Sequence, residues 1–265
     1  MTQIIINILI AIYNGIIFLH IPYALAFSII GLTILIRLAL YPLISSQLKA
    51  SKKMQDLNPH LKKLKDTHKN DAKRLQQETL KLYKEHGVNP AAGCLPVIIQ
   101  LPIIWGLYSV LQEVVKIAPD KVVSEVNRQI YPALSFLKIS SPWDPTFLGL
   151  PLGKTPAQLF STMAAVAILV PVITGFFQFI QSKMMFSPAP KKEGEKDNKK
   201  DDFASVFQSQ SMYIFPIMIG FFSYTFPIGL SLYWNTFTIF GIIQQYRIAG
   251  LGGLSKWVEK IYGKK

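Results

Sequence analysis

The chain has 265 residues, of which 50% are hydrophobic and 16% are charged, and its formal net charge is +13. A soluble domain usually carries about 25% charged residues, so this composition excludes an ordinary soluble protein and indicates one embedded in lipid. The Lys and Arg residues lie between apolar runs and form no recognisable binding module, which argues against a nucleic-acid-binding protein. The single cysteine, Cys94, excludes an intrachain disulfide and a cysteine-based zinc site.

Residues 1–21 are apolar but lack the basic start and the small-residue cleavage site of a secretory signal, so we expect them to remain on the mature protein. Asn7, Asn14 and Gly15 interrupt the apolar run and Pro22 ends it. This pattern predicts an amphipathic helix that lies at the membrane interface. A sixth membrane crossing is the alternative.

The first membrane-spanning helix is predicted over residues 22–44, because Arg37 is the only charge in this apolar stretch. Pro42 is expected to mark its end, since proline lacks an N–H group and disfavours helix in the residue before it.

The next segment, residues 45–90, changes character. From Ser45 to Val88 it contains 11 Lys and Arg against 5 Asp and Glu, and its leucines recur at helical spacing. We predict two amphipathic helices that turn near residues 68–71 and fold as an antiparallel hairpin in the cytoplasm.

Four more spans are predicted from the remaining apolar runs. The stretch 211–249 has Arg247 as its only charge and is too long for one crossing, so the sequence FPIG at 226–229 is expected to divide it. The predicted order is second span 95–113, extracytoplasmic loop 114–157, third span 158–182, charged cytoplasmic linker 183–210, fourth span 211–228, fifth span 229–249 and basic cytoplasmic tail 250–265.

The distribution of basic residues predicts the orientation. The hairpin, the linker and the tail counted from Arg247 together hold 22 of the 28 Lys and Arg residues, and with five spans all three lie on one side. The positive-inside rule assigns that side to the cytoplasm. We therefore predict a multi-pass plasma-membrane protein with its N-terminus outside and its C-terminus in the cytoplasm.

Arg37 raises the free energy of inserting the first span, because an Arg near the centre of a span costs about 2.5–3.5 kcal/mol on insertion scales. The apolar runs of the five predicted spans contain no Asp or Glu. Arg37 therefore either snorkels to the cytoplasmic interface or faces a water-filled cavity.

Other polar side chains share helix faces along the predicted spans. Such stripes also arise from hydrogen bonds between helices, but a lone cation among amides and hydroxyls favours a hydrated groove. The candidate groove residues are Arg37, Thr33, Gln100, Gln178, Gln181, Trp234, Thr238 and Gln245.

A hydrated groove suits an incoming polypeptide, because it shortens the dry distance that the polar flanks of a nascent membrane segment must cross. Arg37 attracts an acidic flank by about 4 kcal/mol at a separation of about 4 Å if the effective dielectric constant is about 20. Burial of the apolar segment then completes insertion without nucleotide hydrolysis.

Enzymatic chemistry finds no support in the sequence. His20, His60, His68 and His86 lie outside the predicted spans, so neither a histidine base nor a di-histidine metal site can be built inside the bilayer. The sequence also lacks a Gly-rich phosphate-binding loop. We predict no enzyme, no catalytic residue, no metal and no cofactor.

Several longer motifs occur in order along the chain, from about residue 3 to about residue 250. They are YNGIIF, TILIRLALYPL, QDLNPHLKKLKD, LYKEHGVNPAAGCLPVIIQLPIIWGLY, SPWDP, FIQSKMMFSP, FPIGLSLYW and FGIIQQY. As an ordered set they resemble the YidC/Oxa/Alb family of membrane protein insertases, and specifically its short five-span bacterial form.

The resemblance implies an all-α polytopic membrane protein whose five transmembrane helices enclose a hydrophilic groove, with a cytoplasmic helical hairpin that receives clients. It makes Arg37 the groove arginine, Thr33 and Trp234 client-contacting positions, and either Gln178 or Gln181 the groove amide of the third span.

The partners that the resemblance implies are nascent membrane proteins and the lipid bilayer, with the ribosome and the Sec translocon as further candidates, for a protein that works as a monomer. The chain lacks the lipoprotein cysteine of some relatives, so no lipid anchor is expected. Its tail is short, which argues against ribosome binding through the tail.

Two other classes of function stay open. A small anion channel or transporter would use Arg37 as its selectivity charge. A purely structural assembly chaperone would depend on the 45–90 hairpin and tolerate the loss of Arg37.

Overall fold

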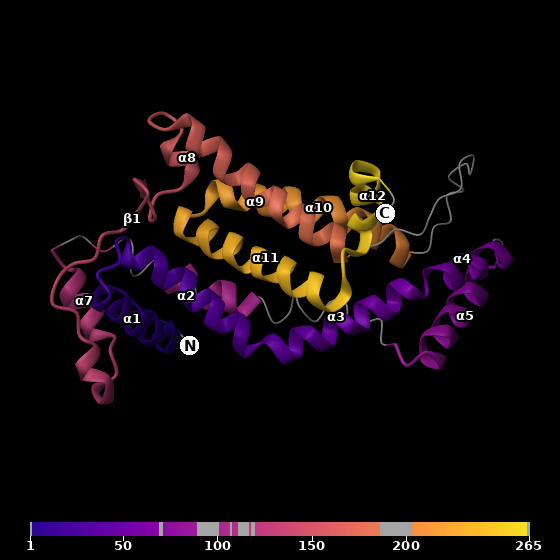
Figure 1. Ribbon diagram of the computed structural model, residues 1–265, viewed down its shortest axis with the longest axis horizontal. Coiled ribbons are helices and arrows are strands. Elements are labelled where there is room, and N and C mark those ends of the chain that lie inside the picture. Colours follow the sequence, from indigo (N-terminus) through magenta and orange to yellow (C-terminus); the bar gives the residue numbers. More distant parts are fainter. Residues whose placement is uncertain are drawn as a thin grey trace. The chain divides into compact units, whose positions relative to one another are not determined.

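The computed structural model of the protein describes residues 2–68, 71–88, 101–106, 108–110, 117, 120–185 and 203–263. The chain divides into two compact units, and the long helices α9, α10 and α11 contribute residues to both (Figure 1). Unit 1 comprises Met1–Leu40, Ile98–Phe177 and Met218–Phe240, and unit 2 comprises Tyr41–Val97, Gln178–Ile217 and Gly241–Lys265.

Unit 1 contains the N-terminal helices, the loop region and most of the apolar core. Its own elements are α1 (Thr2–Phe18), α2 (Ala24–Ala39), α7 (Val122–Arg128), the 3-10 helix η2 (Pro132–Leu137), β1 (Thr146–Phe147), β2 (Leu150–Pro151) and α8 (Pro156–Leu159). The helices shared with unit 2 are α9 (Ala164–Met185), α10 (Phe203–Thr225) and α11 (Ile228–Ala249).

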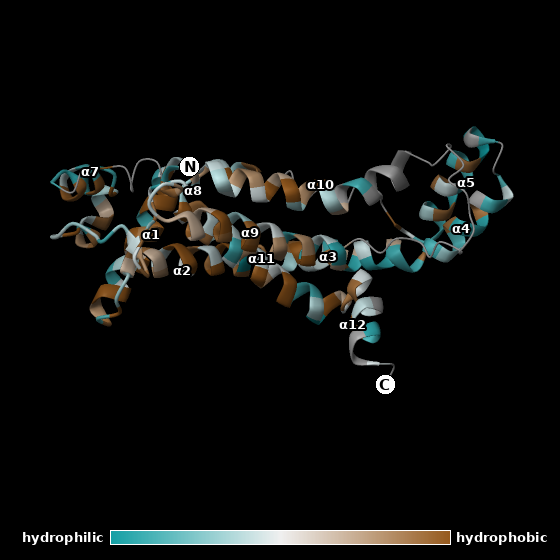
Figure 2. Ribbon diagram, turned by 90° about the horizontal axis from the view of Figure 1, so that it is seen from above, coloured by the Kyte–Doolittle hydropathy of each residue, from teal (hydrophilic) through white to brown (hydrophobic). Residues whose placement is uncertain are grey.

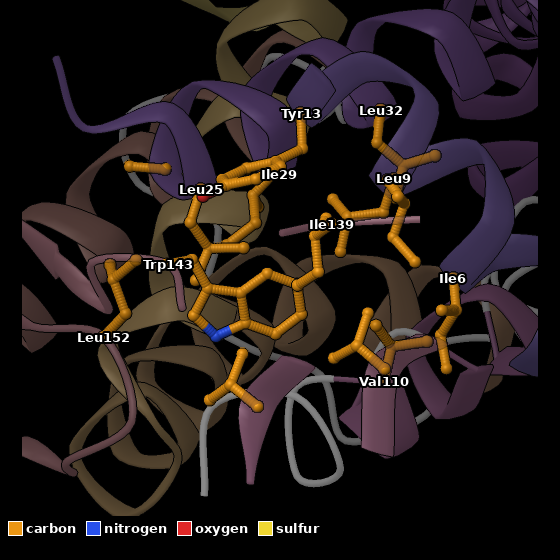
Figure 3. Packing of buried hydrophobic residues seen from close by; sticks show 14 of the residues in the cluster. Ile6, Leu9, Tyr13, Leu25, Ile29, Leu32, Val110, Ile139, Trp143 and Leu152 are labelled. Carbon is orange, nitrogen blue, oxygen red and sulfur yellow. The ribbon is translucent and has the colours of Figure 1, made fainter. Parts of the chain in front are cut away.

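The core of unit 1 forms because α1 and α2 bury apolar side chains at helical spacing against each other. Ile6, Ile10 and Ile29 are fully buried within it. The rings of Tyr13 and Trp143 meet edge to face, with their centroids 5.7 Å apart (Figure 3). The core therefore joins α1 both to α2 and to the loop that precedes β1.

Asn7 and Asn14 do not interrupt α1, which runs through both positions as one helix. The Asn7 side chain accepts a hydrogen bond from the backbone N–H of Tyr131 at 3.0 Å and donates to the carbonyl of Gln129 at 3.0 Å. The Asn14 amide donates to the carbonyl of Leu137 at 2.8 Å. The two asparagines thus attach α1 to residues 129–137, the part of the loop region that follows α7.

The region between α7 and α9 is mostly irregular but ordered by local turns. Strands β1 and β2 form an antiparallel hairpin in which Thr146 pairs with Pro151. Leu148 and Gly149 both have positive φ values, as a two-residue type I′ turn requires. After this hairpin, the carbonyls of Leu152 and Lys154 accept hydrogen bonds from the backbone N–H groups at positions 229 and 228, at 2.8 and 3.0 Å.

Unit 2 contains the basic helices of the chain. Its own elements are α3 (Tyr41–Asp56), α4 (Asn58–Thr67), α5 (Ala72–Glu85), the 3-10 helix η3 (Gly252–Leu254) and α12 (Ser255–Tyr262). Helices α4 and α5 pack side by side and are mainly hydrophilic, whereas α2 and α9 are largely hydrophobic (Figure 2). Asp71 begins α5, because its side chain accepts a hydrogen bond from the backbone N–H of Arg74 at 2.9 Å.

Several helix boundaries differ from those expected from the sequence. The first break comes at Leu40, before Pro42, and Pro42 lies in the first turn of α3, where a missing N–H group costs no helical hydrogen bond. The described residues of the 45–90 region belong to three helices where two were predicted, because α3 ends at Asp56 and α4 begins at Asn58. Helix α9 begins at Ala164 and not at residue 158, because Pro156–Leu159 forms a separate turn with its own capping box.

Among the described residues, α9 is the one helix that is long and apolar enough to cross a membrane by itself. Helices α2 and α3 meet the same criterion only together, as a pair broken between them. Shorter apolar stretches are Thr2–Phe18, Leu101–Val110 and Met212–Thr225. The five spans therefore stay a prediction, and much of the second span and of the charged linker lies outside the described residues.

Candidate functional site

Arg37 is buried near the end of α2 in unit 1, where 3% of it is exposed. Its Nη2 donates a hydrogen bond to the carbonyl oxygen of Phe237 in α11 at 2.6 Å. Its guanidinium carbon lies 3.4 Å from the centre of the Phe237 ring. One residue of α11 thus supplies both a carbonyl and a ring face to Arg37, and neither of these groups carries a charge.

These contacts offset part of the cost of burying the guanidinium. A desolvated cation over an aromatic ring gains about 2 kcal/mol, and a hydrogen bond to a charged group gains about 1.5–3 kcal/mol. The charge itself stays uncompensated, since no acidic side chain of the described residues forms an ion pair with Arg37. The Nε of Arg37 is buried without a hydrogen-bond partner.

Other buried polar atoms of α11 also lack a partner. In unit 1 these are Oδ1 of Asn235 and Oγ1 of Thr238. Leaving such a group unsatisfied costs about 1–3 kcal/mol, so buried polar atoms of this kind are usually bonded to ordered water. Arg37 and these two residues of α11 thus have unused capacity for hydrogen bonds.

Thr33 and Thr238 are both buried, but they differ in whether the hydroxyl has a hydrogen-bond partner. The hydroxyl of Thr33 donates to the carbonyl of Ile29 in its own helix at 2.6 Å, so its proton is already used. The hydroxyl of Thr238 has no partner. Of the two predicted threonines, Thr238 is therefore the better placed to bond a guest or a water molecule.

Trp234 is half-buried and lines a small pocket in unit 1, together with the hydroxyl-bearing residues Thr174, Ser223 and Ser231. Ser223 bonds the hydroxyls of Thr174 at 3.2 Å and of Ser231 at 2.8 Å. These bonds link α9, α10 and α11 side by side. Trp234 thus lies beside a polar contact between three helices, which the sequence analysis did not identify.

Close packing of α9 on α10 accompanies this hydroxyl cluster. A Cβ atom added at Gly220 would lie 3.3 Å from the carbonyl oxygen of Pro171 and 3.7 Å from the Cα of Gly175. Small residues let membrane helices approach closely in this way.

The remaining predicted residues belong to unit 2 or lie outside the described residues. Gln178 and Gln181 are half-buried near the end of α9. Gln245 is buried on α11 and its Oε1 has no partner. Gln100 lies outside the described residues. The structure therefore brings Arg37 against α11, while the glutamines are described within unit 2 only.

Two polar residues of unit 2 were missed by the sequence analysis. The Gln244 amide donates to the carbonyl of Tyr41 and to the hydroxyl of Ser45, both at 3.2 Å. Gln47 is buried, and neither its side-chain nitrogen nor its oxygen has a partner. Two adjacent glutamines on one predicted span, at 244 and 245, could have indicated that Gln244 also faces a neighbouring helix. Gln47 was missed because it lies in the 45–90 segment, which was predicted to be a solvated hairpin.

The described residues contain no group of three or more His, Cys, Asp or Glu side chains able to hold a metal ion. The chemistry of the site is instead that of a buried cation and of amide and hydroxyl groups. Such a site binds and orients a polar guest through hydrogen bonds, and it contains no evident nucleophile and base pair.

Sequence comparisons give the site a context. The model of the family described as "60Kd inner membrane protein" matches residues 16–251. The "Membrane protein insertase YidC" of Fusobacterium nucleatum is 34% identical over 225 residues, covering 85% of this chain and 86% of that protein.

More distant relatives are longer than this chain. The "Inner membrane protein ALBINO3, chloroplastic" of Arabidopsis thaliana is 32% identical over 256 residues, which cover 91% of this chain and 50% of that protein. The "Membrane protein insertase YidC" of Streptomyces avermitilis is 32% identical over 229 residues, covering 84% and 50%. The family match takes in Arg37, Phe237 and the whole of α11. The chain belongs to the 60Kd inner membrane protein family, the family of the YidC, Oxa and Alb insertases.

Proposed function

We propose that this protein is a membrane protein insertase, which takes nascent membrane proteins into the lipid bilayer through a hydrated groove that contains Arg37. No nucleotide is hydrolysed in this mechanism. The further groove residues are Thr33, Gln100, Gln178, Gln181, Trp234, Thr238 and Gln245.

The observation that carries this proposal is the state of Arg37. Its guanidinium is buried against α11, has no acidic partner among the described residues, and keeps one nitrogen without a hydrogen bond. A protein that needed Arg37 only for packing would gain stability by replacing the charge with an apolar side chain. The uncompensated charge is better suited to a transient anionic guest.

The guest in this proposal is the acidic flank of a membrane segment. Arg37 attracts a carboxylate by about 4 kcal/mol at about 4 Å in a medium of effective dielectric constant about 20, and by about 1 kcal/mol in bulk water. Binding of this strength is transient. The membrane potential then draws the negative flank outward with about 2.3 kcal/mol per charge per 100 mV.

The proposed topology has five spans, with residues 1–21 at the interface outside and the tail in the cytoplasm. Helices α4 and α5 carry seven of the protein's lysine and arginine residues, and this basic hairpin receives clients in our proposal. The monomer is the working form, and the ribosome and the Sec translocon are further partners.

Replacing Arg37 by Ala tests the proposal. In cells depleted of their own insertase, we expect Arg37→Ala to slow insertion of a single-span client with an acidic N-terminal tail by about tenfold, equivalent to about 1.4 kcal/mol. Arg37→Lys should retain part of the activity, because an ammonium keeps the charge but not the planar stacking on Phe237. Protease protection of the client tail measures insertion.

A client with a neutral tail and an assay of anion flux make this test decisive. A client with a neutral tail should be inserted equally by the Arg37→Ala variant and by the unaltered chain. Normal insertion of every acidic-tailed client would contradict the groove mechanism and favour an assembly chaperone. Anion flux into proteoliposomes that disappears in Arg37→Ala, with insertion unchanged, would favour a channel instead.

A further inference from the structure

The last turn of α9, residues 182–185, is contacted in unit 2 by two segments distant in sequence. One is the end of α3, which leads into the α4–α5 hairpin, and the other is the tail formed by η3 and α12 (Figure 1). The last four carbonyls of a helix have no donor within that helix. Two carbonyls of this turn, those of Met185 and Met184, are approached by the two segments.

Helix α3 uses one of these carbonyls. The side-chain amide of Gln55 donates to the carbonyl oxygen of Met185 at 2.5 Å. Gln55 is the penultimate residue of α3. The hydrogen bond therefore attaches the end of α3, which precedes α4, to the end of α9.

The tail lies against the preceding carbonyl. Gly252, the first residue of η3, has a φ of +52°, and a Cβ atom at this position would overlap the carbonyl oxygen of Met184. Only glycine allows this backbone so close to α9. The tail and the hairpin base thus occupy neighbouring positions on one helical turn.

Lys183 holds the tail through an aromatic contact. Only 9% of Lys183 is exposed, and its ammonium lies 3.1 Å from the centre of the Trp257 ring of α12 and 5.5 Å from that of Phe179. A helix as short as α12, with eight residues, is not stable in isolation. Its order therefore depends on docking of this kind.

We propose that the last turn of α9 couples the C-terminal tail to the basic hairpin. While Trp257 covers Lys183, the ammonium is held away from the end of α9. When α12 leaves, Lys183 becomes a free cationic donor next to the terminal carbonyls, where lysine side chains bond readily. It then competes with Gln55 for Met185, and the end of α3 loosens.

The coupling is reciprocal, because two equilibria that share one site must influence each other equally. Loss of the Gln55 hydrogen bond therefore weakens docking of α12 by the same factor. A partner that binds the tail would release the hairpin. This inference does not depend on the proposed insertase function.

Hydrogen–deuterium exchange of the full chain in lipid nanodiscs tests the coupling. For Trp257→Ala we expect faster exchange in α12 and about fivefold faster exchange at the end of α3 and in α4, the effect of weakening one ordinary hydrogen bond. Trp257→Phe should retain most of the protection. The matched control is Tyr246→Ala, which removes another exposed aromatic ring of unit 2 and should leave the hairpin unchanged.

Two further variants complete the test. Gly252→Ala blocks docking of the tail without altering Lys183 or Trp257, and it should loosen the hairpin as well. Gln55→Leu should speed exchange in α12. Faster exchange in α12 with an unchanged hairpin would overturn the coupling, and so would unchanged α12 exchange in both tail variants. If a tail variant inserted clients poorly but showed none of these exchange changes, the result would concern the proposed insertase function and would contradict the coupling.

Discussion

At the scale of single residues, the site is defined by polar atoms that lack partners. Arg37 is supported by Phe237 on two sides and yet keeps a buried nitrogen unbonded. Thr238 follows Phe237 directly in α11, and its hydroxyl has no hydrogen-bond partner. Stability alone does not explain such groups, because apolar residues of equal size would avoid their desolvation cost.

Replacing Thr238 by Val separates stability from function. The two side chains have nearly the same shape, so the variant should be as stable as the unaltered chain, or more stable by about 1 kcal/mol, because an unsatisfied hydroxyl is removed. Insertion of an acidic-tailed client should nevertheless slow severalfold if the hydroxyl bonds groove water. Thermal unfolding in detergent and the protease-protection assay measure the two effects.

Thr236→Val is the matched control for this experiment. Its hydroxyl donates to the carbonyl of Leu232 at 2.8 Å and is already satisfied. We expect little change in insertion. Equal insertion defects in both variants would argue that β-branched polar residues of α11 act through packing instead of through water.

At the scale of elements, α1 is more firmly attached than an independent interfacial helix needs to be. It packs on α2 through a fully buried row of side chains and bonds the loop region through its two asparagines. These polar residues were read from the sequence as interruptions. Their partners are backbone groups more than 120 residues away, which no local pattern can indicate.

Asn7→Ala should therefore destabilise unit 1. The change leaves the N–H of Tyr131 without its side-chain partner, at a cost of about 1–3 kcal/mol where water cannot reach it. It also removes one of the two side-chain donors to the carbonyl of Gln129, which keeps its hydrogen bond from Gln3. We expect a lower midpoint of thermal unfolding and faster proteolysis of the loop region. Ile4→Ala, at a position that is 54% exposed, should change neither, and an unaffected Asn7→Ala variant would show that α1 is held by its apolar face alone.

At the scale of the whole molecule, composition and hydropathy predicted a membrane protein, and the motif order predicted the family that the comparisons show. Helical periodicity located α4 and α5. The helix break that was expected at Pro42 comes at Leu40, because Pro42 is tolerated in the first turn of α3. The pairing of Arg37 with Phe237 was not predictable, since it joins residues 200 positions apart.

Cysteine labelling tests the orientation of the molecule. In a Cys94→Ala background, a cysteine at Gln3 should react with a membrane-impermeant maleimide added outside intact cells, whereas one at Lys260 should react only after the cells are opened. This follows from an odd number of spans and the positive-inside rule. Protection of position 3 in intact cells would favour the alternative in which residues 1–21 cross the membrane.

The two backbone hydrogen bonds between residues 152–154 and the start of α11 restrain the position of that end of the helix. They use main-chain atoms only, so substitutions in these side chains leave them in place, except for proline, which removes the donor. They make the FPIG end of α11 a fixed pivot. In the proposed mechanism, a movement of α11 that admits a guest would be smallest at Ile228 and would grow along the helix away from it.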